Sequence, residues 1–225
     1  NLSHFPIMDI KGPDAERMLE YMSVAKVGGS TPEGKVIYTN FLDEDGGVHA
    51  DLTISRLGND SYRVVTGGAD GNRDWVTLRN YRDDNGLDAE INIRTHDIAT
   101  LGLWGPKAAN ALGNFIDPNE IDISNFPFVS AKNLTLNLSG GKKVDVWAAR
   151  ISYVGESGWE IYFNNDKDDG LALYDSLLEV GVVPVGIETY ANSRRLEKSF
   201  RLQGADLETE YTAIEAAIQR PLVKE

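Results

Sequence analysis

The sequence contains no cysteine among its 225 residues. Disulfide bonds, thiolate nucleophiles and cysteine-ligated metal sites are therefore excluded. The chain also lacks an apolar run of about 18 residues, the length that a membrane-spanning helix needs. No signal peptide is recognisable at its start. These features lead us to expect a protein of a reducing compartment, cytoplasmic or, in a eukaryote, in the mitochondrial matrix.

Basic residues are scarce relative to acidic ones. The chain has 22 Lys and Arg against 35 Asp and Glu, which gives a net charge of −13. A chain this acidic is repelled by nucleic-acid phosphates and by anionic lipid. We therefore expect neither nucleic acid nor a membrane surface as a partner, although a local basic pocket could hold a small anion.

Several common catalytic motifs are also missing. The three histidines, His4, His49 and His96, have no metal-ligand spacing, so we predict no metal site. There is no GxGxxG fingerprint, Walker loop or GxSxG elbow. The glycine-rich residues 67–71 fit none of these motifs and are typical of a turn.

An internal repeat is present. Residues 7–22 and 100–115 align at an offset of about 93 positions, which places Gly12 on Gly105 and matches the apolar positions around them. Each copy predicts a short strand, a Gly-Pro turn and a helix. We prefer a true repeat to a chance match and expect two related subdomains, residues 1–97 and 98–225.

The remaining patterns predict an α+β protein in which hairpins outnumber βαβ crossovers. Both ends look cut from a longer protein. The expected strands lie at 35–42, 48–57, 61–66, 87–94, 100–103, 134–138, 144–154 and 159–163, and the expected helices at 72–85, 170–180 and 187–199.

A carboxylate interrupts one of these strands. Residues 48–55 alternate, so that Asp51 and Thr53 lie on the face opposite the apolar side chains. Exposure to water is the simpler interpretation of such a residue. The alternative is that Asp51 lines a pocket.

A second candidate pair flanks the turn GESG. If residues 155–158 form a four-residue hairpin loop, Tyr153 pairs with Glu160 and the two side chains share a face. A phenol beside a carboxylate could bind an amide or a pterin-like heterocycle. An exposed cross-strand pair without function is the alternative.

Cations concentrate near the end of the chain. Arg194, Lys198 and Arg201 fall near one face if this segment is helical. They predict either an anion-binding rim or a solvated helix face.

Five blocks, in order, resemble the glycine-cleavage T-protein (aminomethyltransferase) superfamily, which binds tetrahydrofolate. They are NLSHF with IKGPDA, GGVHADL, TLGLWGPKAANAL, RISYVGESGWEIY and RRLEKSFRLQGADL. Within the superfamily, the sequences of these blocks are most similar to the folate-binding C-terminal region of sarcosine and dimethylglycine dehydrogenases. The resemblance implies two antiparallel-sheet-plus-helix subdomains, without the small C-terminal β-barrel that the family usually has.

The resemblance also implies roles for matched residues. Asp51 aligns with the catalytic carboxylate near the folate nitrogens, and Thr53 points the same way. Glu160 aligns with the acid that binds the pterin ring, and Tyr153 with a neighbouring folate contact. The resemblance thus favours the interpretation that Asp51 lines a pocket.

Some positions depart from the family. Asn1 stands where the family has Asp, and no Arg aligns with the one that grips a distal carboxylate of folate. Tyr190 or Ala191 falls there instead. The resemblance then implies that Tyr190 contacts the cofactor, or that Arg194 or Arg195 anchors the folate tail.

Three functions follow from the resemblance. The first is capture of a formaldehyde-level unit from sarcosine or dimethylglycine by tetrahydrofolate, giving 5,10-methylene-tetrahydrofolate. FAD would then be needed only in an oxidase domain or subunit elsewhere. The second is a stand-alone tetrahydrofolate-dependent demethylase or methyltransferase, and the third is an inactive folate-binding module.

Overall fold

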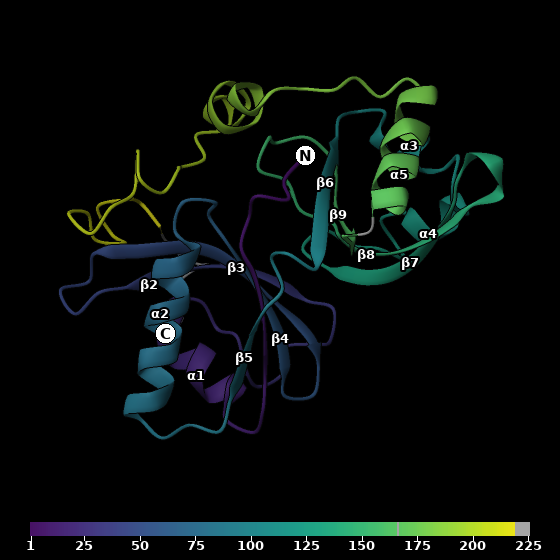
Figure 1. The fold of residues 1–225 in the computed structure, drawn as a ribbon. Helices are drawn as coiled ribbons and strands as arrows, with labels where there is room; N and C mark the ends of the chain where they lie inside the picture. Colours follow the sequence, from purple (N-terminus) through teal and green to yellow (C-terminus); the bar gives the residue numbers. More distant parts are fainter. Residues whose placement is uncertain (166, 219–225) are drawn as a thin grey trace. The chain divides into compact units, whose positions relative to one another are not determined.

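A computed structural model describes residues 1–165 and 167–218, which fold into two compact units (Figure 1). The first, here the β1–β5 unit, contains residues 4–95 and the described chain from Arg201 onward. The second, the β6–β9 unit, contains residues 1–3 and 96–200. Among the described helices, none has both the length and the apolar character needed to cross a membrane.

The β1–β5 unit is built on an antiparallel sheet with strand order β2-β3-β4-β1-β5. Strict alternation in β3 sends its apolar residues to one face, where they pack with the helices α1 and α2 into a single core. The elements are β1 (Ile7–Lys11), α1 (Ala15–Met22), β2 (Val36–Leu42), β3 (Val48–Gly58), β4 (Ser61–Thr66), α2 (Gly71–Asp84) and β5 (Glu90–Ile93).

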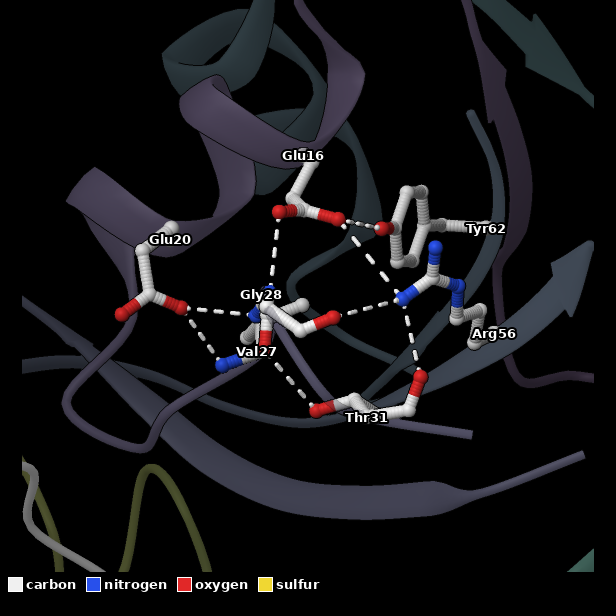
Figure 2. A network of polar contacts seen from close by, with 8 residues as sticks. Glu16, Glu20, Val27, Gly28, Thr31, Arg56 and Tyr62 are labelled. Atoms are coloured by element: carbon white, nitrogen blue, oxygen red, sulfur yellow. Dashed lines mark hydrogen bonds and ion pairs between the residues drawn. The ribbon is translucent and has the colours of Figure 1, made fainter. Parts of the chain in front are cut away.

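A polar network fixes the loop after α1 (Figure 2). Glu20 accepts hydrogen bonds from the backbone N–H groups of Val27 (2.6 Å) and Gly28 (2.8 Å). Glu16 accepts one from the hydroxyl of Tyr62 at 2.9 Å and lies 3.7 Å from Arg56. Glu16 also accepts a hydrogen bond from the backbone N–H of Gly29 at 2.9 Å, which is the largest cause of its lowered pKa, followed by the bond from Tyr62. The loop is thus held by carboxylates of the preceding helix.

The β6–β9 unit has an antiparallel sheet of order β6-β9-β8-β7. Its core lies between one sheet face and the helices, and fully buries Trp159. The elements are β6 (Ile98–Trp104), α3 (Ala108–Leu112), α4 (Pro118–Ile121), β7 (Ala131–Asn137), β8 (Lys143–Ala149), β9 (Gly158–Asn164) and α5 (Lys167–Glu179), followed by a π-helix (Thr189–Arg194) and α6 (Arg195–Glu197).

The expected repeat is present in the topology. Four strands run in the order β2-β3-β4-β1 in one sheet and β7-β8-β9-β6 in the other. In both copies the glycine of the Gly-Pro turn has a positive φ, 143° at Gly12 and 135° at Gly105. Its carbonyl accepts from the N–H of the first helical residue, Ala15 or Ala108, at 3.0 Å. The two units are therefore built on one strand–turn–helix plan.

Residues 201–218 belong to the β1–β5 unit, although they follow the β6–β9 unit in the sequence. Val48 donates from its backbone N–H to the carbonyl of Tyr211 at 2.9 Å, and Leu207 joins Val48 in a small core. The helix expected at 187–199 forms over residues 187–197, and its middle is the π-helix that precedes α6.

Candidate functional site

Asp51 lies at the middle of β3, on the face that carries the polar side chains. Ala50 and Leu52 beside it are buried in the core of the opposite face. Asn40 of β2 pairs directly with Asp51, and Tyr38 pairs with Thr53. Cross-strand partners share a face, so these four side chains form one polar patch on the sheet.

The surroundings of Asp51 favour its protonated form. The side chain is half-buried, and desolvation raises its pKa to about 7, aided by the negative charges of Asp70 and Asp74. A hydrogen bond from Tyr38 acts in the opposite direction. A carboxyl group with this pKa can both accept and release a proton near neutral pH. It is not merely a solvated strand residue.

A buried amide beside Asp51 is incompletely satisfied. Asn40 is 1% exposed, and its Nδ2 donates to the carbonyl of Ala50 at 3.2 Å. Its Oδ1 has no hydrogen-bond partner among the described residues. A buried acceptor without a partner costs about 1–3 kcal/mol, so this oxygen is suited to a ligand N–H or O–H.

Sequence patterns do not single out the carboxylates on and before α2. Asp74 is buried and accepts a hydrogen bond from Thr66. Burial raises its pKa, while Thr66 and Arg73 oppose the shift. Asp70 and Asp74 recur at helical spacing, but only the packing of α2 on the sheet makes them neighbours of Asp51.

Glu160 lies in the middle of β9 and is 7% exposed. Tyr162, two residues along the same face, donates a hydrogen bond to its Oε2 at 2.5 Å. Burial raises the pKa of Glu160 to about 7, and the bond from Tyr162 opposes this shift. We find no hydrogen bond to Oε1 among the described residues. This oxygen remains available as an acceptor.

The predicted pairing of Tyr153 with Glu160 is wrong. Strand β8 ends at Ala149, and Ala149 pairs with Glu160. The guanidinium of the next residue, Arg150, turns inward and donates to the carbonyls of Ile121 (3.0 Å) and Phe126 (2.8 Å). The connection spans residues 150–157, twice the expected loop length.

Small residues flank Glu160 on both sides. Its partners across the sheet are Ala149 and Gly102. In the next row, Thr100 pairs with Tyr162. Thr100 is 1% exposed, and its hydroxyl lacks a partner within the described part of the chain. The face therefore places a carboxylate and a hydroxyl next to two small residues, and the ring of Trp104 covers one of them, Gly102.

Tyr153 and Tyr190 belong to an aromatic series. The ring centroid of Tyr190 lies 5.5 Å from that of Trp104 and 5.4 Å from that of Tyr153. Tyr153 stacks in turn on Phe200 at 6.0 Å. The structure thus brings the two predicted tyrosines together, although not through the predicted hairpin.

The two arginines offered as folate-tail anchors are already engaged. Arg195 is buried and donates to the carbonyls of Ala191 (2.7 Å) and Phe200 (3.0 Å). Arg194 forms ion pairs with Glu156 at 2.6 Å and Glu197 at 2.7 Å. These contacts shape the segment, and cofactor binding by Arg195 stays a prediction.

An open groove of about 410 Å³ lies beside the second Gly-Pro turn. Its lining includes Trp104, Lys107 and Val180–Val183, but neither Asp51 nor Glu160. The groove lacks carboxylates for proton transfer, so we place the candidate chemistry on the two polar sheet faces.

The whole chain matches a known family. The family model described as the GCVT N-terminal domain matches residues 1–224. The chain belongs to the GCVT family. This confirms the resemblance seen in the five sequence blocks.

Relatives of this GCVT chain support the same grouping. It is 31% identical over 226 residues to mitochondrial dimethylglycine dehydrogenase of Homo sapiens, covering 97% of this chain and 24% of that protein. It therefore spans about a quarter of the length of this relative.

Solved structures confirm the α+β fold. Aminomethyltransferase T of the glycine cleavage system from Bartonella henselae matches with a TM-score of 0.82 and 24% identity, over 99% of this chain and 56% of that one. Heterotetrameric sarcosine oxidase from Corynebacterium sp. U-96 matches with a TM-score of 0.53 and 16% identity, over 81% of this chain and 84% of that one.

Proposed function

We propose that this GCVT domain binds tetrahydrofolate and transfers to it a formaldehyde-level one-carbon unit from sarcosine or dimethylglycine, giving 5,10-methylene-tetrahydrofolate. The observation that carries the proposal is Asp51, a half-buried carboxyl with a pKa raised to about 7 on a polar sheet face. A purely structural strand residue gains nothing from such a position, because burial of the charge is unfavourable.

The residues present fit a reduced pterin. Oε1 of Glu160 and the hydroxyl of Thr100, neither of which has a hydrogen-bond partner among the described residues, lie on one face beside Gly102 and Ala149. A carboxylate binds well to adjacent N–H donors, such as those of a 2-amino-4-oxopyrimidine ring. When bound, tetrahydrofolate would supply the nitrogen nucleophiles for the one-carbon unit.

Asp51 would act on charge and protons at the reacting nitrogen. Its ionised form stabilises a cationic iminium group, and the same oxygen can accept the proton that the nitrogen loses. The hydrogen bond from Tyr38 keeps part of the Asp51 population ionised at neutral pH. Thr53, on the same face, would orient the reacting group.

Tyr153 and Tyr190 would contact the cofactor through their aromatic series. Tyr190 or Ala191 falls near the place of the family Arg, and the ring of Tyr190 packs between Trp104 and Tyr153. Stacking would then replace an ion pair in holding the ligand. Arg195 would act only through the segment that its backbone hydrogen bonds shape.

The methyl donor and partner are inferred from the relatives. Identity to a dimethylglycine dehydrogenase supports an N-methylated glycine as the source of the one-carbon unit. We expect an FAD-dependent oxidase domain or subunit to generate the iminium. The transfer of the one-carbon unit from the iminium to tetrahydrofolate would itself need no flavin bound to this chain.

A stand-alone demethylase is the second candidate. The departure from the family Arg near Tyr190 and Ala191 favours it, because a change in the residue that holds the folate tail is compatible with a change of methyl donor. This function gives methyl-tetrahydrofolate without a flavin. Mass spectrometry of the folate product separates the two, since only the first function gives the methylene form.

The test compares Asp51→Asn with the wild-type chain under anaerobic conditions. We measure tetrahydrofolate binding by calorimetry and the acceleration of methylene-tetrahydrofolate formation from formaldehyde over the uncatalysed rate. We expect the variant to bind within a few-fold of wild type and to lose roughly 10²-fold of the acceleration.

Asp145→Asn is the matched control, since Asp145 is an exposed strand carboxylate bonded to Thr135 at 2.6 Å. It should behave as wild type. Full acceleration by Asp51→Asn would show that Asp51 is not the catalytic residue. Absence of tetrahydrofolate binding by the wild-type chain would contradict the proposed function itself.

A further inference from the structure

We propose that Trp104 forms the aromatic wall of the site around Glu160, on which the planar half of the bound ring stacks. The inference rests on the proposed binding of tetrahydrofolate and adds a ring-positioning residue to it. Neither the repeat nor the charge pattern of the sequence singles out this tryptophan.

The indole of Trp104 lies in the row of the sheet that contains Glu160. Gly102 pairs with Glu160, so the two residues share a row of the sheet. A Cβ atom at Gly102 would lie 2.1 Å from Cζ3 and 2.2 Å from Cη2 of Trp104. The six-membered ring of Trp104 therefore lies directly over Gly102. It occupies the space of a missing side chain, one strand away from Glu160.

Contacts with neighbouring residues fix the orientation of this ring. Trp104 Nε1 donates to the carbonyl of Ile151 at 2.8 Å. Tyr190 stacks on the indole with an interplanar angle of 25°. A hydrogen bond, a stacked neighbour and a close backbone contact together hold the indole in place before any ligand arrives. Such preorganisation reduces the entropy lost on binding.

Small and aromatic residues surround Glu160 on this face of the sheet. Glu160 has the small residues Gly102 and Ala149 as its neighbours across the sheet, and the large side chain next to this row is the indole that covers Gly102. In the following row Tyr162 contacts Trp147 edge-on, with centroids 5.0 Å apart. The carboxylate thus lies in a row of small residues next to aromatic ones. This arrangement suits a flat heterocycle with N–H groups at its edge.

Trp104 is half-buried, and that leaves part of its surface accessible. A tryptophan that only filled the gap above Gly102 could be replaced by any apolar side chain of sufficient size. A tryptophan that stacks on a ligand needs an aromatic face. The two roles therefore respond differently to Phe and to Leu.

The experiment titrates tetrahydrofolate, and separately a tetrahydropterin without the aminobenzoyl-glutamate tail, into the chain by anaerobic calorimetry. The variants are Trp104→Phe, Trp104→Leu and Glu160→Ala, with near-UV circular dichroism to verify folding. Trp75→Phe is the matched control, a half-buried tryptophan of α2 that stacks with Arg79 at 4.8 Å.

We expect Trp104→Leu to weaken both ligands by the same factor, about tenfold or more, as loss of an aromatic stack does. Trp104→Phe should stay within about threefold of wild type, and Trp75→Phe should not differ from it. Equal binding by the Leu and Phe variants would overturn the inference. So would a loss confined to the ligand that carries the tail.

The two proposals fail separately. If the wild-type chain binds neither ligand, the proposed function is wrong. If it binds both and Glu160→Ala abolishes binding while Trp104→Leu does not, the proposed function stands and the role of Trp104 is refuted. If Trp104→Leu does not fold, Gly102→Ala takes its place, since the added Cβ displaces the indole and should weaken both ligands equally.

Discussion

At the residue scale, both candidate carboxyl groups are costly to ionise. Burial is the leading cause of the raised pKa in Asp51 and in Glu160, and each reaches about 7. Each lies near a buried oxygen, Asn40 Oδ1 or the Thr100 hydroxyl, that has no hydrogen-bond partner in the described part of the chain. Polar groups left unsatisfied in this way are expected where a ligand completes the hydrogen bonding.

Glu160→Gln should stabilise the folded protein at alkaline pH. The folded pKa of Glu160, about 7, lies above its ordinary value of 4.5. Between these values the folded state holds a proton that the unfolded state has lost, so wild-type stability falls as pH rises through this window. A glutamine carries no charge, and its free energy of unfolding should exceed that of wild type by about 2–3 kcal/mol at pH 8.

Urea unfolding at pH 5 and pH 8 measures this difference. At pH 5 the variant and wild type should be nearly equal, since Glu160 is then largely protonated in the folded state. Glu90→Gln, at an exposed position of β5, provides the control and should follow the wild-type profile. A Glu160→Gln profile parallel to wild type would show that burial does not penalise the charge.

At the element scale, the two Gly-Pro turns have the same backbone but different surroundings. Gly12 and Gly105 have nearly equal positive φ values. A Cβ at Gly12 would lie 2.4 Å from the carbonyl oxygen of Asp88, whereas a Cβ at Gly105 meets nothing within 4 Å. The repeat thus supplies an internal comparison of backbone strain with and without a steric clash.

Gly12→Ala should destabilise the protein more than Gly105→Ala. Strain at positive φ alone costs about 1 kcal/mol, which we expect for Gly105→Ala. The clash with backbone atoms at Gly12 should raise the cost above about 2 kcal/mol. Chemical denaturation of the two variants gives both values. Equal losses would mean that the first turn can move away from Asp88.

The hairpin before β9 shows why element ends are difficult to predict. The apolar alternation of β8 continues past residue 149, and GESG is a good turn sequence. The strand nevertheless ends at Ala149, and the guanidinium of the next residue, Arg150, donates to the carbonyls of Ile121 and Phe126. These acceptors are more than 20 residues away in the sequence, so no local pattern reveals them.

At the scale of the whole molecule, the chain crosses between its two units more than once. Residues 201–218 pack on the β1–β5 unit, and Leu207 is fully buried beside Val48. Gly47 lies so near this segment that a Cβ would be 2.1 Å from the carbonyl of Thr209. The segment therefore supports the start of β3, the strand that carries Asp51.

Leu207→Ala should loosen β3 selectively. Removing this buried side chain leaves a cavity, and we expect a loss of about 2–3 kcal/mol. Hydrogen exchange followed by mass spectrometry should show faster exchange at the start of β3 and unchanged exchange in β8 and β9. Leu171→Ala, at a half-exposed site on α5, controls for loss of a leucine as such. Equal acceleration in both sheets would contradict the assignment of residues 201–218.

The sequence by itself determined the α+β class, the repeat and the polar face of β3. These features depend on periods of two and 3.6 residues and on Gly-Pro turns, all of which are local. Only the tertiary structure decided the register that pairs Glu160 with Gly102, the stack that joins Tyr153 to Tyr190, and the place of Trp104 over a glycine. Such contacts join residues that are distant in the chain, and their geometry depends on how whole elements pack.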